Sequence, residues 1–293
     1  MTDIGELATN LREIEEGYWV SCDDRQISYP EDGNSACFQL EENSYWFQHR
    51  NNVITAMVDA HPPAGAIFDI GGGNGYVAMG LQRTGYETAL VEPGPQGARN
   101  AKTRGLNTVI QSTLQDAGFQ EAALPAIGLF DVLEHIEDDL GFLKMLHASL
   151  KPGGHLYLAV PAGQTLWSID DTLAGHYRRY SRKTLTHQLQ AAGFEICRFS
   201  YFFSFLVPPV FLLRTLPSRL GLRKSVPLET SKKEHAAPAG VGRAILERCR
   251  AFEMTRIRGG RGLVAGTSCI AVAKKVAGNA DLMRCVFGTS SSS

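Results

Sequence analysis

The stretch from Ala66 to Gly80 constrains the fold of this chain more than any other. It reads AIFDIGGGNGYVAMG: an apolar strand, an acidic residue, a glycine-dense turn and then an apolar helix. Glycine adopts backbone dihedral angles that are closed to other residues, and it lets the backbone approach a ligand closely. A strand, a glycine loop and a helix in this order indicate an α/β sheet with a nucleoside cofactor at the loop.

The glycine loop alone does not identify the cofactor. The segment Asp69–Gly75 reads DIGGGNG, but Gly73–Ala78 also satisfies the G-x-G-x-x-G/A pattern of dinucleotide sites. Glu92 ends the next expected strand, about twenty residues past the acidic residue, where such sheets bind the two hydroxyl groups of a ribose. This spacing fits NAD and S-adenosylmethionine equally well.

Strands and helices alternate beyond the loop. The segments 87–93, 107–111, 126–133 and 155–161 are strand-like, and helical patterns separate them. Such alternation specifies right-handed crossovers and a mainly parallel sheet that helices cover on both faces. The segment 266–275 is expected to be the last strand.

Charge is balanced over the whole chain, with 29 basic and 30 acidic residues, but it is uneven along the sequence. Residues 214–261 contain twelve Lys and Arg and four Glu, so this segment is basic, whereas the rest of the chain is acidic on balance. A solvated surface is one interpretation of this segment. An anionic substrate, a membrane surface or a protein partner is the other.

The most apolar stretch is 201–213, YFFSFLVPPVFLL. It is too short to span a bilayer, and Pro208 and Pro209 interrupt it. We expect a core strand followed by a helix that lines a pocket. An interfacial segment that admits an apolar substrate, with peripheral membrane contact, is the alternative.

The six cysteines are scattered and form no C-x-x-C pair of the kind that binds zinc or acts as a redox dithiol. The N-terminus has no apolar signal core. We therefore expect a cytoplasmic protein with reduced thiols and no bound metal.

Two later segments narrow the choice of cofactor. Residues 129–138 read LFDVLEHIED, and 150–154 read LKPGG before a further strand. Together with the loop Asp69–Gly75, they resemble the class I S-adenosylmethionine-dependent methyltransferases, and most closely the small-molecule branch that includes the quinone-biosynthesis methyltransferases. The resemblance covers about 45–200 and resumes at 262–276. It implies an α/β, doubly wound, Rossmann-like fold with a mainly parallel seven-stranded sheet and an antiparallel last strand.

The resemblance also divides the chain into parts. The methyltransferase core would cover 45–200 and 262–276, after an N-terminal cap over 1–44. That cap is expected to begin as an acidic helix and to continue as an aromatic hairpin around the turn Pro30–Gly33. Residues 201–261 would form the basic, partly apolar insert over the pocket, and 277–293 would be a disordered tail.

The resemblance assigns residues to the cofactor. In that family the glycine loop holds the methionine part of S-adenosylmethionine, Glu92 takes the ribose, and the residues matching Thr113 and Leu114 flank the adenine. The L-E-H turn faces the transferable methyl group, which makes His135 the residue nearest the chemistry. The expected cofactor-binding residues are Asp69, Gly71, Gly73, Gly75, Glu92, Thr113, Leu114 and Phe130.

A second group of polar side chains follows the fifth strand. Residues 166–181 read LWSIDDTLAGHYRRYS and are similar to a segment that forms part of the pocket in a subgroup of these enzymes. A loop at the carboxyl end of a strand is where α/β folds place their sites. The arginines could clamp a carboxylate or phosphate, or could only pair with neighbouring aspartates. The expected substrate contacts are Trp167, Asp170, Tyr177, Arg178 and Arg179.

The cofactor dictates what the protein must do. A sulfonium already activates its methyl group, so the protein must align the acceptor, exclude water and, for a hydroxyl acceptor, remove a proton. Histidine suits proton removal because its ordinary pKa is about 6.5. His135 or His176 is the expected general base, with Asp170 or Asp171 orienting or replacing it. For His135, packing beside the cofactor is a rival role.

The expected acceptor is a small amphiphilic or anionic molecule. The turn after the fourth strand lacks the N-P-P-Y type of motif that cradles a base amino group, so methylation of nucleic-acid bases is disfavoured. The basic segment leaves a membrane lipid, RNA or protein as alternative substrates. A non-catalytic cofactor-binding scaffold and an NAD-dependent oxidoreductase are further alternatives.

Overall fold

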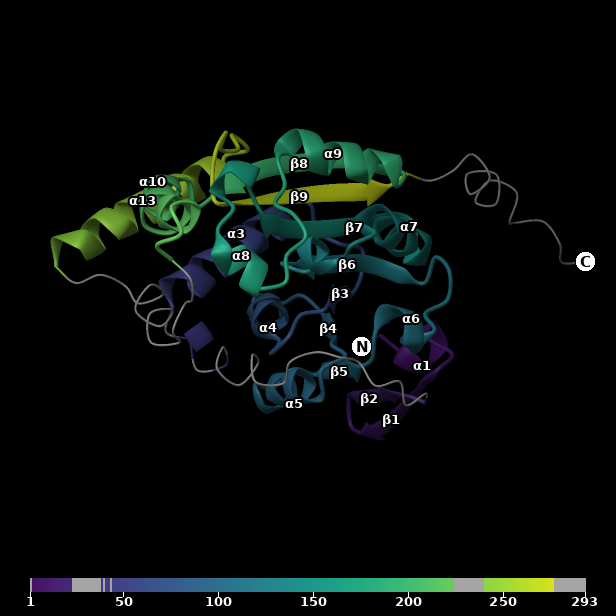
Figure 1. The fold of residues 1–293 in the computed structure, drawn as a ribbon. Helices are drawn as coiled ribbons and strands as arrows, with labels where there is room; N and C mark the ends of the chain where they lie inside the picture. Colours follow the sequence, from purple (N-terminus) through teal and green to yellow (C-terminus); the bar gives the residue numbers. More distant parts are fainter. Residues whose placement is uncertain (1, 23–37, 39, 43, 224–239, 277–293) are drawn as a thin grey trace, which may run out of the picture.

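The structure is a computed structural model that describes residues 2–22, 38, 40–42, 44–223 and 240–276. Within these residues, nine strands form one sheet with helices on both faces (Figure 1). In spatial order the strands are β1 (Leu11–Glu15), β2 (Tyr18–Ser21), β5 (Thr108–Gln111), β4 (Thr88–Val91), β3 (Ile67–Ile70), β6 (Leu124–Phe130), β7 (Leu150–Pro161), β9 (Ser268–Lys275) and β8 (Phe194–Phe202).

The strand directions confirm the mainly parallel sheet. From β2 to β7 in this order, each strand runs parallel to its neighbour. β9 pairs antiparallel with both β7 and β8, and β1 pairs antiparallel with β2. The expected antiparallel last strand is therefore confirmed.

The helices form two layers, as the alternating sequence predicts. One layer contains α3 (Tyr45–Ala60), α4 (Tyr76–Arg83), α5 (Pro95–Thr103) and α13 (Val241–Arg258), and the other contains α1 (Ile4–Leu7), α6 (Leu114–Ala117), α7 (Asp139–Ser149) and α9 (Arg182–Ala191). Successive side chains of β3 alternate between the layers. Ile67 packs with α3 and α4, whereas Phe68 and Ile70 join the core under α7 and α9.

The N-terminus corrects two expectations. Only Ile4–Leu7 is helical in the expected acidic helix, because Leu11–Glu15 forms β1. β1 pairs with β2, which itself pairs with β5, and this pairing overrides the local helical preference of the Glu-rich segment Leu11–Glu15. β1 and β2 extend the sheet on one side, so the expected seven strands become nine. The expected hairpin turn Pro30–Gly33 lies outside the described residues.

The apolar stretch 201–213 forms a strand end and a helical segment, as expected. β8 ends at Phe202, and a 3₁₀ turn, α10 (Val207–Val210), a π-helical turn and α11 (Leu216–Arg219) follow. Nowhere in the described parts of the chain is there a helix that is both long and apolar enough to cross a membrane.

Candidate active site

A cavity of about 640 Å³ opens at the carboxyl end of the parallel strands. Its walls come from the loop between β3 and α4, the end of β6, the start of α3, the loop after β7 and the segment after β8. The carboxyl ends of parallel strands are where open α/β sheets bind their ligands. The cavity therefore lies at the edge of the sheet where the sequence analysis expects the site.

The glycine loop has a backbone that only glycine adopts without strain. Gly71, Gly73 and Gly75 have φ angles of +69°, +55° and +70°. A Cβ atom at Gly72 would lie 2.4 Å from Oδ2 of Asp69, which is closer than real Cβ contacts come. Gly75 precedes α4 and offers no side-chain cap to the first amides of that helix.

Asp69 is fully buried below this loop and lines the cavity. Among the described residues, no side chain donates a hydrogen bond to either of its carboxylate oxygens, and the backbone amide of Ala78 is the group that favours its ionised form by hydrogen bonding. Burial raises its pKa from 3.8 to about 7, although the positive charge of Arg50 acts in the opposite direction. An unpaired buried carboxylate is costly, so the arrangement fits a ligand that brings a cationic or hydrogen-bonding group.

The raised pKa of Asp69 predicts a pH-dependent stability. The native protein keeps a proton on Asp69 up to pH about 7, whereas the unfolded chain releases it near pH 3.8. The contribution of Asp69 to stability is therefore fully present below pH 3.8 and is lost as the pH rises through about 7. We expect the Asp69→Asn variant to lose less stability over this range than the wild type, as measured by the thermal unfolding midpoint at several pH values. Identical pH profiles would contradict the prediction.

Glu92 lies behind the loop, immediately after β4. Its carboxylate accepts hydrogen bonds from the backbone amides of Gly73 (2.9 Å) and Gly94 (2.8 Å), and burial raises its pKa. Glu92 thereby holds the loop in shape, and it is not itself part of the cavity wall. Each carboxylate oxygen retains capacity for a further hydrogen bond.

Thr113 and Leu114, the residues expected to flank the adenine, do not line the cavity, whereas the glycine loop does. Thr113 caps α6 by accepting from the amide of Asp116 at 2.9 Å, and Leu114 is buried in the core. Neither residue is in the cavity wall, whereas Phe130 is. The cofactor-binding roles of all three remain predictions.

Asp171 organises the second half of the site. Its Oδ1 lies 3.0 Å from Nδ1 of His176 and accepts a hydrogen bond from Nε of Arg179 at 2.7 Å. Burial raises its pKa, but the hydrogen bonds from His176 and Arg179 outweigh burial and lower it to about 2. Asp171 therefore stays ionised at neutral pH and fixes the orientation of the imidazole.

His176 and His135 meet at the cavity wall. Their ring centroids lie 4.7 Å apart with an angle of 83° between the planes. Burial and the neighbouring His176 lower the pKa of His135. Glu134 is buried beside them, and burial and the charge of Asp131 raise its pKa. Ligand atoms of Glu134, His135 and His176 lie within 4.8 Å of one another, so this group could hold a cation.

The structure does not bring every expected substrate residue to the cavity. Arg179 lines it, whereas Trp167, Asp170, Tyr177 and Arg178 do not. Two of these residues make ion pairs elsewhere. Asp170 pairs with Arg223 at 3.1 Å, and Arg178 pairs with Asp139 at 2.8 Å. The sequence left open that the arginines only pair with Asp170 and Asp171. Arg179 does pair with Asp171 at 2.7 Å, whereas Arg178 pairs with Asp139 instead.

Sequence reasoning missed the contribution of α3. Arg50 is buried, pairs with Asp131 at 2.6 Å and donates to the backbone oxygen of Phe130 at 3.1 Å. Asp131 has φ +57°, a strained conformation for a residue with a Cβ atom. Trp46 and Phe47 of the same helix line the cavity. An arginine at the apolar face of an expected helix was the available signal.

The segment after β8 supplies an apolar wall. Leu206, Pro209, Val210 and Leu213 line the cavity, which confirms the expected pocket-lining helical segment. Arg214 is the basic residue of this wall. The lining of the site thus combines acidic and glycine residues with apolar residues from the segment after β8.

Comparisons with known proteins agree with the expected family. The family model described as "Methyltransferase domain" matches residues 46–198. The ubiquinone biosynthesis O-methyltransferase of Methylocella silvestris is 33% identical over 114 residues, which are 37% of this chain and 44% of the relative. The protein of that name from Xanthomonas campestris pv. campestris is 26% identical over 103 residues, or 33% of this chain and 43% of the relative. The chain thus spans less than half the length of these relatives.

Solved structures agree with the expected fold. A methyltransferase in complex with the Haloferax volcanii Trm112 methyltransferase activator matches with a TM-score of 0.53 at 16% identity, covering 84% of this chain and 95% of that chain. Phosphoethanolamine N-methyltransferase 2 of Haemonchus contortus, in complex with S-adenosyl-L-methionine, matches with a TM-score of 0.51 at 16% identity, covering 86% and 58%. At this identity the likeness establishes the fold, and it confirms the expected Rossmann-like class.

Proposed function

Because this chain belongs to the methyltransferase domain family, we propose that it transfers a methyl group from S-adenosylmethionine to a hydroxyl group of a small amphiphilic molecule. The observation that carries the proposal is the Asp171–His176 pair, whose imidazole lines the same cavity as the glycine loop. A hydroxyl acceptor must lose a proton, and an oriented imidazole is suited to remove it.

The site fits the cofactor at its glycine-rich side. Asp69 has an unpaired buried carboxylate that would receive the amino group of the methionine part, and the loop from Gly71 to Gly73 would lie along it. Glu92 would take the ribose hydroxyls with the hydrogen-bond capacity that its two backbone partners leave. When bound, S-adenosylmethionine supplies a methyl group that its sulfonium already activates.

The protein's own residues would supply the proton transfer. Asp171 would accept a hydrogen bond from Nδ1–H of His176, and Nε2 would then be the basic nitrogen. His135 packs against this ring and would help to exclude water from it. Arg179 shares the same carboxylate and would hold Asp171 in place.

The class of the acceptor molecule is inferred from the apolar residues that line the cavity. Leu206, Val210 and Leu213 would contact an apolar tail, while Arg214 would meet an anionic group. The partial relatives named ubiquinone biosynthesis O-methyltransferase support an oxygen acceptor on an amphiphilic molecule.

The test combines binding with product analysis. We expect calorimetry to show binding of S-adenosylmethionine and S-adenosylhomocysteine but not of NADH. Labelled S-adenosylmethionine should then methylate the oxygen of phenols with an alkyl chain faster than that of the matched phenols without one. Label that appears on amines alone would contradict an oxygen acceptor, and label that appears on RNA or protein alone would contradict a small-molecule one.

A further inference from the structure

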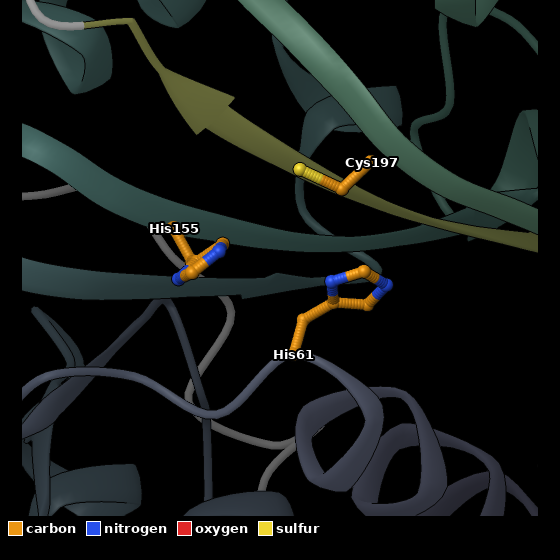
Figure 2. A group of neighbouring side chains, drawn as sticks. All are labelled: His61, His155 and Cys197. Carbon is orange, nitrogen blue, oxygen red and sulfur yellow. The ribbon is translucent and has the colours of Figure 1, made fainter.

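A second cluster of ligand-type side chains lies at the far end of the sheet from the cavity. His61 caps the carboxyl end of α3. His155 lies in β7, where this strand pairs with Ala126 near the start of β6, and Cys197 is near the start of β8. Figure 2 shows the three side chains around a common space. The cavity, by contrast, adjoins Phe130 and Pro161, where β6 and β7 end.

We propose that His61, His155 and Cys197 bind a Zn²⁺ ion. One ligand atom from each residue lies within 4.8 Å of the other two. Zinc bonds to imidazole nitrogen at about 2.0–2.1 Å and to thiolate sulfur at about 2.3 Å, in tetrahedral geometry. Ligand atoms around bound zinc are therefore roughly 3.5 Å apart, and modest side-chain movement brings these three to that spacing. Two nitrogens and a sulfur favour zinc over magnesium or calcium, which prefer oxygen.

Each ligand is held by a separate rigid element. The backbone oxygen of His61 accepts a hydrogen bond from the hydroxyl of Tyr157, and the ring of His155 stacks on Tyr157 with centroids 5.9 Å apart. Cys197 lies at a register shift of β8, between Ile196 and Arg198, where a strand departs from regular alternation. Cys197 is also exposed, which provides a path for an ion to enter.

The electrostatic surroundings suit neutral imidazole ligands. Burial lowers the pKa of both His61 and His155, and the positive charges of Arg198 and Lys274 act in the same direction. Metal ligation requires this neutral form of histidine and the thiolate form of cysteine. Because burial and the charge of Glu195 raise the pKa of the Cys197 thiol, the ion must displace its proton. The positive charges of Arg198 and Lys274 oppose a cation, and Glu195, which lies directly across from Lys274 in the β8–β9 pairing, offsets one of them.

Zinc here would join three segments that are distant in the sequence. It would fasten the carboxyl end of α3 to the sheet, while the amino end of the same helix carries Trp46 and Arg50 at the cavity. The expectation of no metal rested on the absence of a C-x-x-C pair. That criterion does not detect ligands that are contributed by separate elements.

Cobalt provides a direct test, because a thiolate bound to Co²⁺ gives a charge-transfer absorption in the near ultraviolet. We expect metal-free protein to show this absorption with Co²⁺ and to lose it when Zn²⁺ is added. The Cys197→Ser variant should not show it, and the control Cys22→Ser should, because Cys22 is exposed and outside the cluster. The cavity group around Glu134 contains no sulfur, so it cannot produce the signal.

The proposed role of the histidines as zinc ligands is tested by measuring the affinity of variants for zinc. His155→Ala should weaken zinc binding in competition titrations by more than about tenfold, since even loss of an outer partner of a zinc ligand costs about 10- to 100-fold. Circular dichroism of each variant reports whether it is folded. Absorption that persists in Cys197→Ser, or that is absent from folded wild-type protein, would overturn the proposal.

Discussion

Replacing His176 by glutamine is expected to lower the kcat of methyl transfer by about 100- to 10,000-fold. Glutamine can keep a hydrogen bond to Asp171, which lies 3.0 Å from the imidazole, but it cannot accept a proton at neutral pH. The affinity for S-adenosylmethionine should be unchanged, because the residues proposed to bind the cofactor, Asp69, Glu92 and the glycine loop, do not include His176. Single-turnover kinetics and calorimetry measure the two quantities separately.

A matched control is His187→Gln, which changes an exposed histidine of α9 and should leave kcat unchanged. Retained activity in His176→Gln with loss of activity in His135→Gln would transfer the role of the base to His135. If instead chelation abolished activity and Mg²⁺ restored it, a cation held with Glu134 would replace the histidine base in the mechanism.

The Glu92→Ala substitution is expected to weaken S-adenosylmethionine binding by about 100-fold. Hydrogen bonds to a charged group contribute roughly 1.5–3 kcal/mol each, and 1.4 kcal/mol corresponds to tenfold in affinity. The variant would lose the proposed ribose acceptor. It would also leave the backbone amides of Gly73 and Gly94 without their acceptor, so the loop would no longer be held in the binding shape.

Calorimetry with S-adenosylhomocysteine measures this loss without any acceptor molecule. Glu87→Ala is the control, because Glu87 is an exposed acid at the other end of β4. Glu92→Gln should lie between alanine and wild type, since it retains one side-chain oxygen as an acceptor. Equal affinity of the alanine variant and the wild type would remove Glu92 from the cofactor site.

The part of the fold that the sequence predicted is the part that local patterns determine. The loop from Asp69 to Gly75, the alternating strands and helices, and the antiparallel strand at 268–275 were all expected. The strand β1 was not, and β2 was expected only as part of an N-terminal hairpin, because its pairing with β5 joins segments that are far apart in the sequence. A Glu-rich segment such as Leu11–Glu15 carries no local signal of such a partner.

The residues of the candidate site also divide into those that local sequence patterns predict and those that only tertiary packing brings to the cavity. Asp69, His135, His176 and Arg179 were expected and do line one cavity, because they follow motif positions at the ends of strands. Arg50 could not be assigned from the sequence. Its role depends on its contact with Asp131, which only tertiary packing creates.

Neighbours in the sequence can also separate in space. Arg178 and Arg179 are adjacent in a polar loop, yet the first pairs with Asp139 and the second with Asp171. Side chains of consecutive residues in an extended segment point in opposite directions, so a cluster in the sequence does not ensure a cluster in the fold.

The position of β9 has a consequence for how the chain folds during synthesis. β9 contains Ser268–Lys275, yet it lies between β7 and β8 rather than at an edge of the sheet. When the chain has been synthesised only as far as Phe202, β7 and β8 are present, but β9, which lies between them in the sheet, is not. The parallel half of the sheet can assemble early, but β8 can join it only after Lys275 has been made, and until then two unpaired strand edges are open to other chains.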